Sequence, residues 1–258
     1  MARRQFAIVA KVTVVFLAAF ASANALPRPP ATRSPTFTAS AASSPGPILV
    51  RLPTTLAATA GPPKGLTKTI YLTFDDGPNP TWTPEILSLL EDSGAQASFF
   101  VIGENAKSWP KLVEREARDG DTIGDHTWSH PNLTQLSATV VWAELARDKN
   151  LITELTGTEP SLWRPPYEAF NPAVLAIASG LAMKMQLWSV DTGDWQLPGT
   201  EVIVLRVMVA LHNGMVVLLH DGGGDTRSQT VAAVAILIPE LQAAGYRLAA
   251  LPPQGVAR

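Results

Sequence analysis

Short apolar runs alternate with longer segments of helical periodicity between residues 69 and 252. The runs are too short for helices, and continuous ones such as MVVLL predict strands that are buried on both faces. The predicted strands cover residues 70–74, 97–102, 122–124, 162–163, 185–189, 215–219 and 247–251. The predicted helices cover residues 84–93, 107–119, 137–155, 172–179, 201–211 and 228–244. This repeated order predicts an α/β fold with a parallel sheet.

Residue types near the ends of these segments support the helix boundaries. Thr83 followed by Pro84 suits a helix start, with Thr83 as the N-cap and Pro84 in the first helical position. Gly120 and Gly157 follow two of the predicted helices, where glycine adopts the left-handed conformation that closes a helix.

The first 68 residues lack this alternation and predict segments outside the domain. Arg3 and Arg4 precede an apolar run over residues 12–21, and Ala23-Asn24-Ala25 fits a cleavage site, so residues 1–25 predict a signal peptide. The alternative is a retained membrane anchor. Residues 26–68 are rich in Pro, Ala, Ser and Thr and predict a semi-stiff linker or, alternatively, an irregular layer packed on the domain.

This organisation predicts a catalytic domain over residues 69–252, followed by a short tail at residues 253–258. It also predicts a secreted protein, either extracellular or in the cell envelope, with an N-terminal membrane anchor as the alternative.

Composition narrows the class of protein. Hydrophobic residues make up 46% of the chain, which suffices for a sizeable core. The net charge of −2 gives neither the basic footprint of a nucleic-acid-binding protein nor a polybasic membrane patch. The absence of cysteine excludes a disulfide framework and thiol chemistry.

Polar residues whose side chains could take part in catalysis or bind a metal follow the predicted strands. They are Asp75, Asp76, His126, Arg164, Asp191, Asp194 and His220. In a parallel barrel the carboxyl ends of the strands meet at one face, where active sites form. We therefore expect these side chains to share one site.

Two adjacent carboxylates and a pair of histidines indicate a metal centre at that face. Asp75 and Asp76 cannot both be ionised in a half-buried site without a cation or a strong donor nearby. His126 and His130 are four residues apart and can share an ion. A carboxylate with two imidazoles suits Zn²⁺ and leaves a position open for water, although Co²⁺, Ni²⁺ or Mn²⁺ could use the same ligands.

Five motifs carry these residues, namely TFDDGP, HTWSHP, RPPY, DTGDW and VLLHD. Each alone has an ordinary explanation, such as a turn, a surface histidine pair or a packing tryptophan. Together, in this order, they resemble the polysaccharide deacetylase family, also called the NodB-homology domain or carbohydrate esterase family 4. The resemblance implies a distorted TIM-like (β/α)7-8 barrel, one divalent metal ion, and removal of N-acetyl or sometimes O-acetyl groups from glycans.

The resemblance also implies a role for each motif residue. Asp75 would be the general base, with Arg164 holding it in place. His220 would be the general acid, with Asp194 orienting it and keeping it protonated. The metal ligands would be Asp76, His126 and His130.

Three more residues would contact the substrate. The backbone N–H of Tyr167 would help to stabilise the oxyanion, and Trp195 and Leu218 would wall the pocket for the acetyl methyl group. Glu168 and Asp125 stand where family members often have Gly and Asn. We expect both to add negative charge at the mouth of the site and to disfavour anionic glycans.

The predicted function is metal-dependent N-deacetylation of glycans that contain N-acetylglucosamine, with peptidoglycan ranked before chitin-type oligomers. The expected partner is this polysaccharide, and we expect a monomer without an obligate protein partner or nucleic acid. Three alternatives remain: an O-acetyl xylan esterase, an inactive glycan-binding wall module, and a C–N hydrolase of small cyclic amides.

Overall fold

The computed structural model describes residues 68–256. The predicted signal peptide and almost all of the predicted linker lie outside the described residues, as do residues 257 and 258. Within the part that is described, no helix combines the length and the apolar character that crossing a membrane would require.

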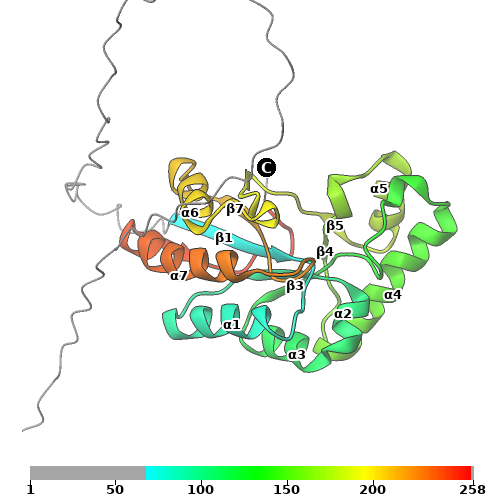
Figure 1. The fold of residues 1–258 in the computed structure, drawn as a ribbon. Helices are drawn as coiled ribbons and strands as arrows, with labels where there is room; N and C mark the ends of the chain where they lie inside the picture. The colour runs from blue at the N-terminus through cyan, green and yellow to red at the C-terminus, as the bar shows by residue number, and fades with distance from the viewer. Residues whose placement is uncertain (1–67, 257–258) are drawn as a thin grey trace, which may run out of the picture. The chain divides into compact units, whose positions relative to one another are not determined.

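The described chain alternates strands and helices, as the apolar pattern predicts (Figure 1). The strands are β1 Lys68–Asp75, β2 Ser98–Val101, β3 Thr122–Asp125, β4 Leu162–Trp163, β5 Lys184–Met185, β6 Val190–Asp191, β7 Met215–His220 and β8 Tyr246–Leu248. The α-helices are α1 Trp82–Ser93, α2 Gly103–Ser108, α3 Pro110–Arg118, α4 Ala138–Thr156, α5 Pro172–Gly180, α6 Thr200–Val209 and α7 Ser228–Ala243. Short 3-10 turns are η1 Leu133–Gln135, η2 Pro166–Glu168 and η3 Asp194–Gln196.

The strands form one curled parallel sheet in the order β5-β4-β3-β2-β1-β7-β6, with β8 paired to the first residues of β1. The outermost strands β5 and β6 do not pair with each other, so the barrel stays open between them. The prediction of a distorted (β/α) barrel is confirmed.

Alternation along β1 separates two sides of the sheet. Ile70, Leu72 and Phe74 belong to the large apolar cluster that the sheet shares with α1, α6 and α7. The residues between them turn to the barrel interior, which places Thr73 at mid-height and Asp75 at the carboxyl end. The same alternation in β7 brings His220 opposite Asp75, its register partner.

Three local predictions differ from the structure. The segment 185–189 is not one strand, because only Met185 belongs to a strand, as the last residue of β5. The next strand, β6, begins at Val190. The single helix expected at 107–119 is two helices, α2 and α3, which meet at Trp109. Thr83 is not the N-cap of α1; it lies inside the helix, and its hydroxyl donates a hydrogen bond to Asp221.

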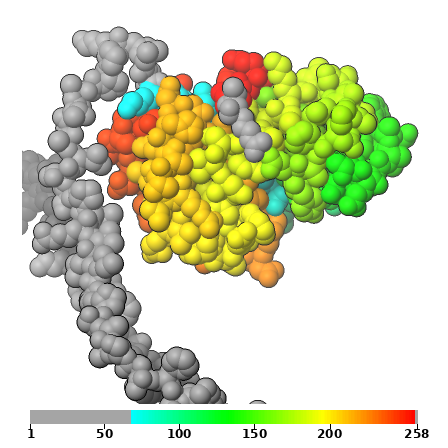
Figure 2. Space-filling model, turned by 90° about the horizontal axis from the view of Figure 1, so that it is seen from above, coloured from blue at the N-terminus to red at the C-terminus, as the bar shows by residue number. Residues whose placement is uncertain are grey.

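A second apolar cluster consists of Phe100, Leu162, Val216 and Leu251, with Val256 packed against them. Two hydrogen bonds tie down the last described residues, from the Ser161 hydroxyl to the carbonyl of Pro253 and from the Val256 N–H to the Gln186 side chain. Figure 2 shows these C-terminal residues (red) against the yellow-green segment.

Candidate active site

The carboxyl end of β1 carries Asp75, which is buried and held from inside the barrel. Nη1 of Arg164 donates to its Oδ1 at 2.6 Å and to the hydroxyl of Thr73 at 2.9 Å. Arg164 is itself fully buried, with its guanidinium stacked 4.0 Å from the ring centroid of Phe100. Its Nε donates to the carbonyl of Gln186 at 2.9 Å. The carboxylate of Asp75 is thus fixed by a cation whose own position is fixed.

The next residue, Asp76, turns its carboxylate toward two imidazoles. Its Oδ1 lies 3.4 Å from Nε2 of His126 and 3.2 Å from Nε2 of His130. One ligand atom from each of these three residues lies within 4.8 Å of the others. The structure therefore brings together the three residues that the sequence predicts as metal ligands.

The other ring nitrogen of each histidine is engaged elsewhere. Nδ1 of His126 lies 2.7 Å from the carbonyl oxygen of Arg164, so it carries the proton and leaves Nε2 as the free lone pair in the neutral ring. Nδ1 of His130 lies 3.2 Å from the hydroxyl of Tyr167, whose ring packs edge-on against the imidazole. Such outer partners set the tautomer and orientation of ligating histidines.

These residues fit a divalent cation. Oδ1 of Asp76 is buried and accepts no hydrogen bond within the described chain. Burial favours the neutral acid, but the facing His126 and His130 side chains outweigh it and hold the pKa of Asp76 well below its usual range. A buried carboxylate beside the Nε2 atoms of two histidines is a donor set for Zn²⁺ or a similar ion.

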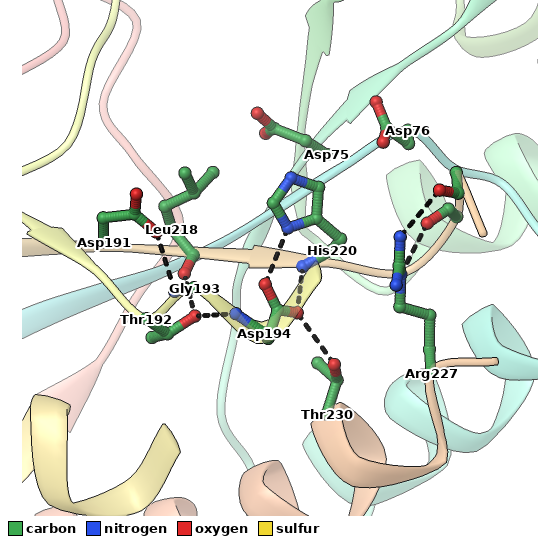
Figure 3. Close-up of polar contacts among 12 residues, drawn as sticks. Asp75, Asp76, Asp191, Thr192, Gly193, Asp194, Leu218, His220, Arg227 and Thr230 are labelled. Carbon is green, nitrogen blue, oxygen red and sulfur yellow. Dashed lines mark hydrogen bonds and ion pairs between the residues drawn. The ribbon is translucent and has the colours of Figure 1, made fainter. Parts of the chain in front are cut away.

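On the β7 side, His220 and Asp194 are joined by two hydrogen bonds (Figure 3). Nδ1 of His220 donates to Oδ1 of Asp194 at 2.7 Å, and the His220 N–H donates to Oδ2 at 2.9 Å. Thr230, in the first turn of α7, donates its hydroxyl to the same Oδ2 at 2.7 Å. Burial alone would lower the pKa of His220, but Asp194, with smaller contributions from Asp75 and Asp76, raises it to about 9. At neutral pH this imidazole is therefore charged.

The residues predicted to contact substrate border the same end of the barrel. Tyr167 in η2 is 69% exposed, and Trp195 in η3 is 53% exposed. Leu218 is buried in β7 two residues before His220, and its carbonyl accepts a hydrogen bond from Thr192. Asp191 is exposed, and its Oδ1 caps the Gly193 N–H instead of facing the ligands. The catalytic and binding roles of these residues remain predictions.

Strained backbone is concentrated at this site. Among the described residues, seven non-glycine residues have positive φ, and five of them lie in the motifs around the metal ligands or directly after one of these motifs. These five are Asp76, Thr127, His130, Tyr167 and Glu168. Such conformations are costly and persist where the surrounding structure imposes them, which is common at functional sites.

One expectation about charge is wrong. Asp125 does not add charge at the mouth, because its carboxyl is fully buried at the end of β3 and accepts the Thr127 N–H at 2.8 Å. Burial raises its pKa to about 7. Glu168 is half-buried beside Tyr167, so the expectation about its charge remains a prediction.

Sequence reasoning missed several supporting residues. Asp148 accepts the backbone N–H of His126 at 3.2 Å, Thr230 supports Asp194, and Asn105 donates to the carbonyl of Asp76 at 2.9 Å. For the first two the sequence holds a signal, since each is a polar residue at a position where its helix turns its apolar face inward. Asn105 offers no such signal.

The chain is similar to known deacetylases. A sequence model of the family described as polysaccharide deacetylase matches residues 63–186. A peptidoglycan-N-acetylglucosamine deacetylase of Bacillus cereus is 42% identical over 182 residues, which cover 70% of this chain and 84% of the relative. A chitooligosaccharide deacetylase of Bradyrhizobium is 36% identical over 197 residues, or 72% and 90% of the two chains. The solved peptidoglycan deacetylase PdaC of Bacillus subtilis aligns with a TM-score of 0.66 at 35% identity, covering 71% and 88%.

Proposed function

The chain belongs to the polysaccharide deacetylase family, and from this premise we propose that it is a metal-dependent N-deacetylase of glycans that contain N-acetylglucosamine. Membership makes it a hydrolase that removes acetyl groups. The metal dependence, the amide bond as the target and the identity of the glycan are the parts that we propose.

Asp76, His126 and His130 would hold one divalent cation, with Zn²⁺ favoured by the ligand types. When bound, such an ion supplies Lewis-acid polarisation of a carbonyl oxygen and lowers the pKa of a nearby water molecule. Asp75, held by Arg164 through Oδ1, would accept a proton from the attacking water through its other oxygen, Oδ2. The Tyr167 N–H would donate to the developing oxyanion.

The observation that carries the proposal is the pair of His220 and Asp194. Cleavage of an amide needs a proton for the departing amine, whereas an alkoxide leaves an ester more easily. With a pKa of about 9, His220 is protonated at neutral pH, and its Nε2–H is available because Nδ1 is bound to Asp194. A pre-charged acid of this kind favours N-deacetylation over O-deacetylation.

For the glycan, we rank peptidoglycan first and chitin-type oligomers second. The relatives named as peptidoglycan-N-acetylglucosamine and chitooligosaccharide deacetylases support these two classes. The exposed rings of Tyr167 and Trp195 can stack on sugar rings that flank the cleaved acetamide. The apolar run near the N-terminus supports a secreted or envelope-bound enzyme that acts on a cell wall.

Acetate release by the purified protein tests the proposal. We would supply peptidoglycan, an N-acetylglucosamine oligomer and acetylated xylan, each with added Zn²⁺ or with a chelator. We expect release from peptidoglycan or the oligomer only with the ion, and a loss of about 10²- to 10⁴-fold in Asp75→Asn, the range for removal of a general base.

Three outcomes would contradict it. Release from acetylated xylan alone would make the protein an O-acetyl esterase. An absence of release from all three substrates, in protein that has bound the ion, would favour the glycan-binding module. Equal rates with the ion and with the chelator would contradict the metal dependence.

A further inference from the structure

The turn after His220 lies directly against the predicted metal ligand Asp76. The backbone N–H groups of Asp221 and Gly222 face the carbonyl of Asp75, at 3.1 and 3.4 Å. This places the turn beside the end of β1, where the chain changes direction at Asp76 with a φ of 70°.

Gly222 and Gly223 leave no room for a side chain at this contact. A Cβ on Gly222 would overlap with the carbonyl group of Asp76, and a Cβ on Gly223 would overlap with its Oδ2 and Cγ. Gly223 also has a φ of +68°, which an L-residue rarely adopts. The bare glycine backbone is therefore the wall against which the Asp76 carboxylate rests.

Arg227 holds this wall in place. It is buried, and its Nε and Nη2 donate to the carbonyls of Gly222 and Gly223 at 2.6 and 2.8 Å, while Nη1 donates to that of Thr226 at 3.2 Å. Figure 3 shows the guanidinium of Arg227 bonded to the two carbonyls, below Asp76 in this view. A planar guanidinium can hold two successive carbonyls in this way, whereas a lysine ammonium is a point donor.

We propose that Arg227 and the Gly222–Gly223 turn are positioning elements for the cation, because they fix the Asp76 carboxylate with Oδ1 facing His126 and His130. The inference rests on the proposed function of Asp76 as a ligand. It adds residues that are not among the three predicted ligands. Its geometric basis is the contact of both glycines with Asp76 together with the three hydrogen bonds of Arg227.

The test compares two glycine substitutions at positive φ. Gly223→Ala adds a methyl group against the carboxylate of Asp76. Gly214→Ala is the matched control, because Gly214 has a φ of +82°, precedes the same strand β7, and offers open space in which a methyl group would meet nothing within 4 Å. Both variants carry the backbone strain, and only the first disturbs Asp76. Arg227→Met and Arg227→Lys test the support of the turn.

The readout is Co²⁺ added to the metal-free full-length protein, followed by calorimetry and by the visible absorption of the bound ion. We expect about 10- to 100-fold weaker binding for Gly223→Ala and Arg227→Met, the range for outer-shell partners of a metal site. The visible spectrum of bound Co²⁺ should change in the variants that bind it more weakly. Gly214→Ala should bind Co²⁺ with wild-type affinity, and Arg227→Lys should have an intermediate affinity.

The outcomes separate this inference from the proposed function. Wild-type Co²⁺ affinity and spectrum in Gly223→Ala would overturn the inference and leave the metal site standing. Equal weakening in Gly214→Ala would also overturn it, because strain alone would then explain the loss. If the wild-type protein bound no divalent ion, the proposed metal site would fall and this inference with it.

Discussion

The two sides of the site differ in how completely their polar groups are paired. On the cation side, formed by Asp76, His126 and His130, the buried Oδ1 of Asp76 accepts no hydrogen bond from residues 68–256. The acid side, formed by Asp194, His220 and Thr230, is closed by hydrogen bonds of 2.7–2.9 Å. A buried polar atom without a partner is costly, whereas a paired one is not.

This difference indicates what each side needs before it can act. The cation side has its three predicted ligands together, and in the proposed function it would need an ion to compensate them. The acid side holds its charge without any ion, because Asp194 stabilises the charged imidazole of His220. We expect substitutions on the two sides to separate metal binding from proton donation.

The largest effect is expected on the cation side. Replacing a direct ligand, as in His126→Ala, should weaken Zn²⁺ binding by more than the roughly 100-fold that outer-shell substitutions reach, and activity should fall with it. His212→Ala is the matched control, since this remaining histidine is exposed and bonded only to the carbonyl of Ala210 among the described contacts. Calorimetric titration measures both. Near-normal binding in His126→Ala would remove the distinction between the two sides.

A smaller effect, on a different quantity, is expected on the acid side. His220→Gln should lower kcat by about 10²- to 10⁴-fold, the usual contribution of a general acid, because the amine leaves without a proton. Zn²⁺ affinity should stay at the wild-type level, since His220 is not among the three ligands. Steady-state kinetics and calorimetry on the same preparation give the two numbers. A loss of metal binding as large as in His126→Ala would contradict the separation.

A still smaller effect is expected on the pH dependence of activity. As the proposed general acid, His220 would act while protonated, so kcat/KM should fall as the pH rises through its pKa of about 9. Asp194→Asn removes the carboxylate that raises this pKa, so the alkaline limb of the kcat/KM profile should move to lower pH. Thr230→Val removes one hydrogen bond to Asp194 and should move the limb less. An alkaline limb unchanged by Asp194→Asn would show that another group sets it.

The same pair makes folding stability depend on pH. The pKa of His220 is raised from 6.5 in the unfolded chain to about 9 in the fold, so the stabilisation is complete below pH 6.5. It is lost as the pH rises from 6.5 through 9. Denaturation of wild-type and Asp194→Asn protein across this range should show the stability difference shrinking toward alkaline pH.

The strand ends of the barrel were predictable because parallel strands bring their carboxyl ends together. Asp75, Asp76, His126 and His220 each follow an apolar run, and that position is visible in the sequence. Thr230 and Asp148 were available in principle as polar residues on apolar helix faces.

Other features depend on distant contacts that no local pattern records. Thr83 is a residue type that often caps helices, yet its hydroxyl donates a hydrogen bond to Asp221, which lies 138 positions later in the chain. The burial of Asp125 depends on the packing of α4 over β3. The fork of Arg227 depends on how the glycine turn folds back on Asp76.

The acid side should be assembled without the ion, and a pH titration of the His220 ring by NMR in metal-free protein tests this directly. We expect a pKa of about 9, with Nδ1 protonated throughout the titration. A pKa near 6.5, the value of an ordinary histidine, would contradict it, because His220 would then be mostly neutral at neutral pH and Asp194 would not be what charges it.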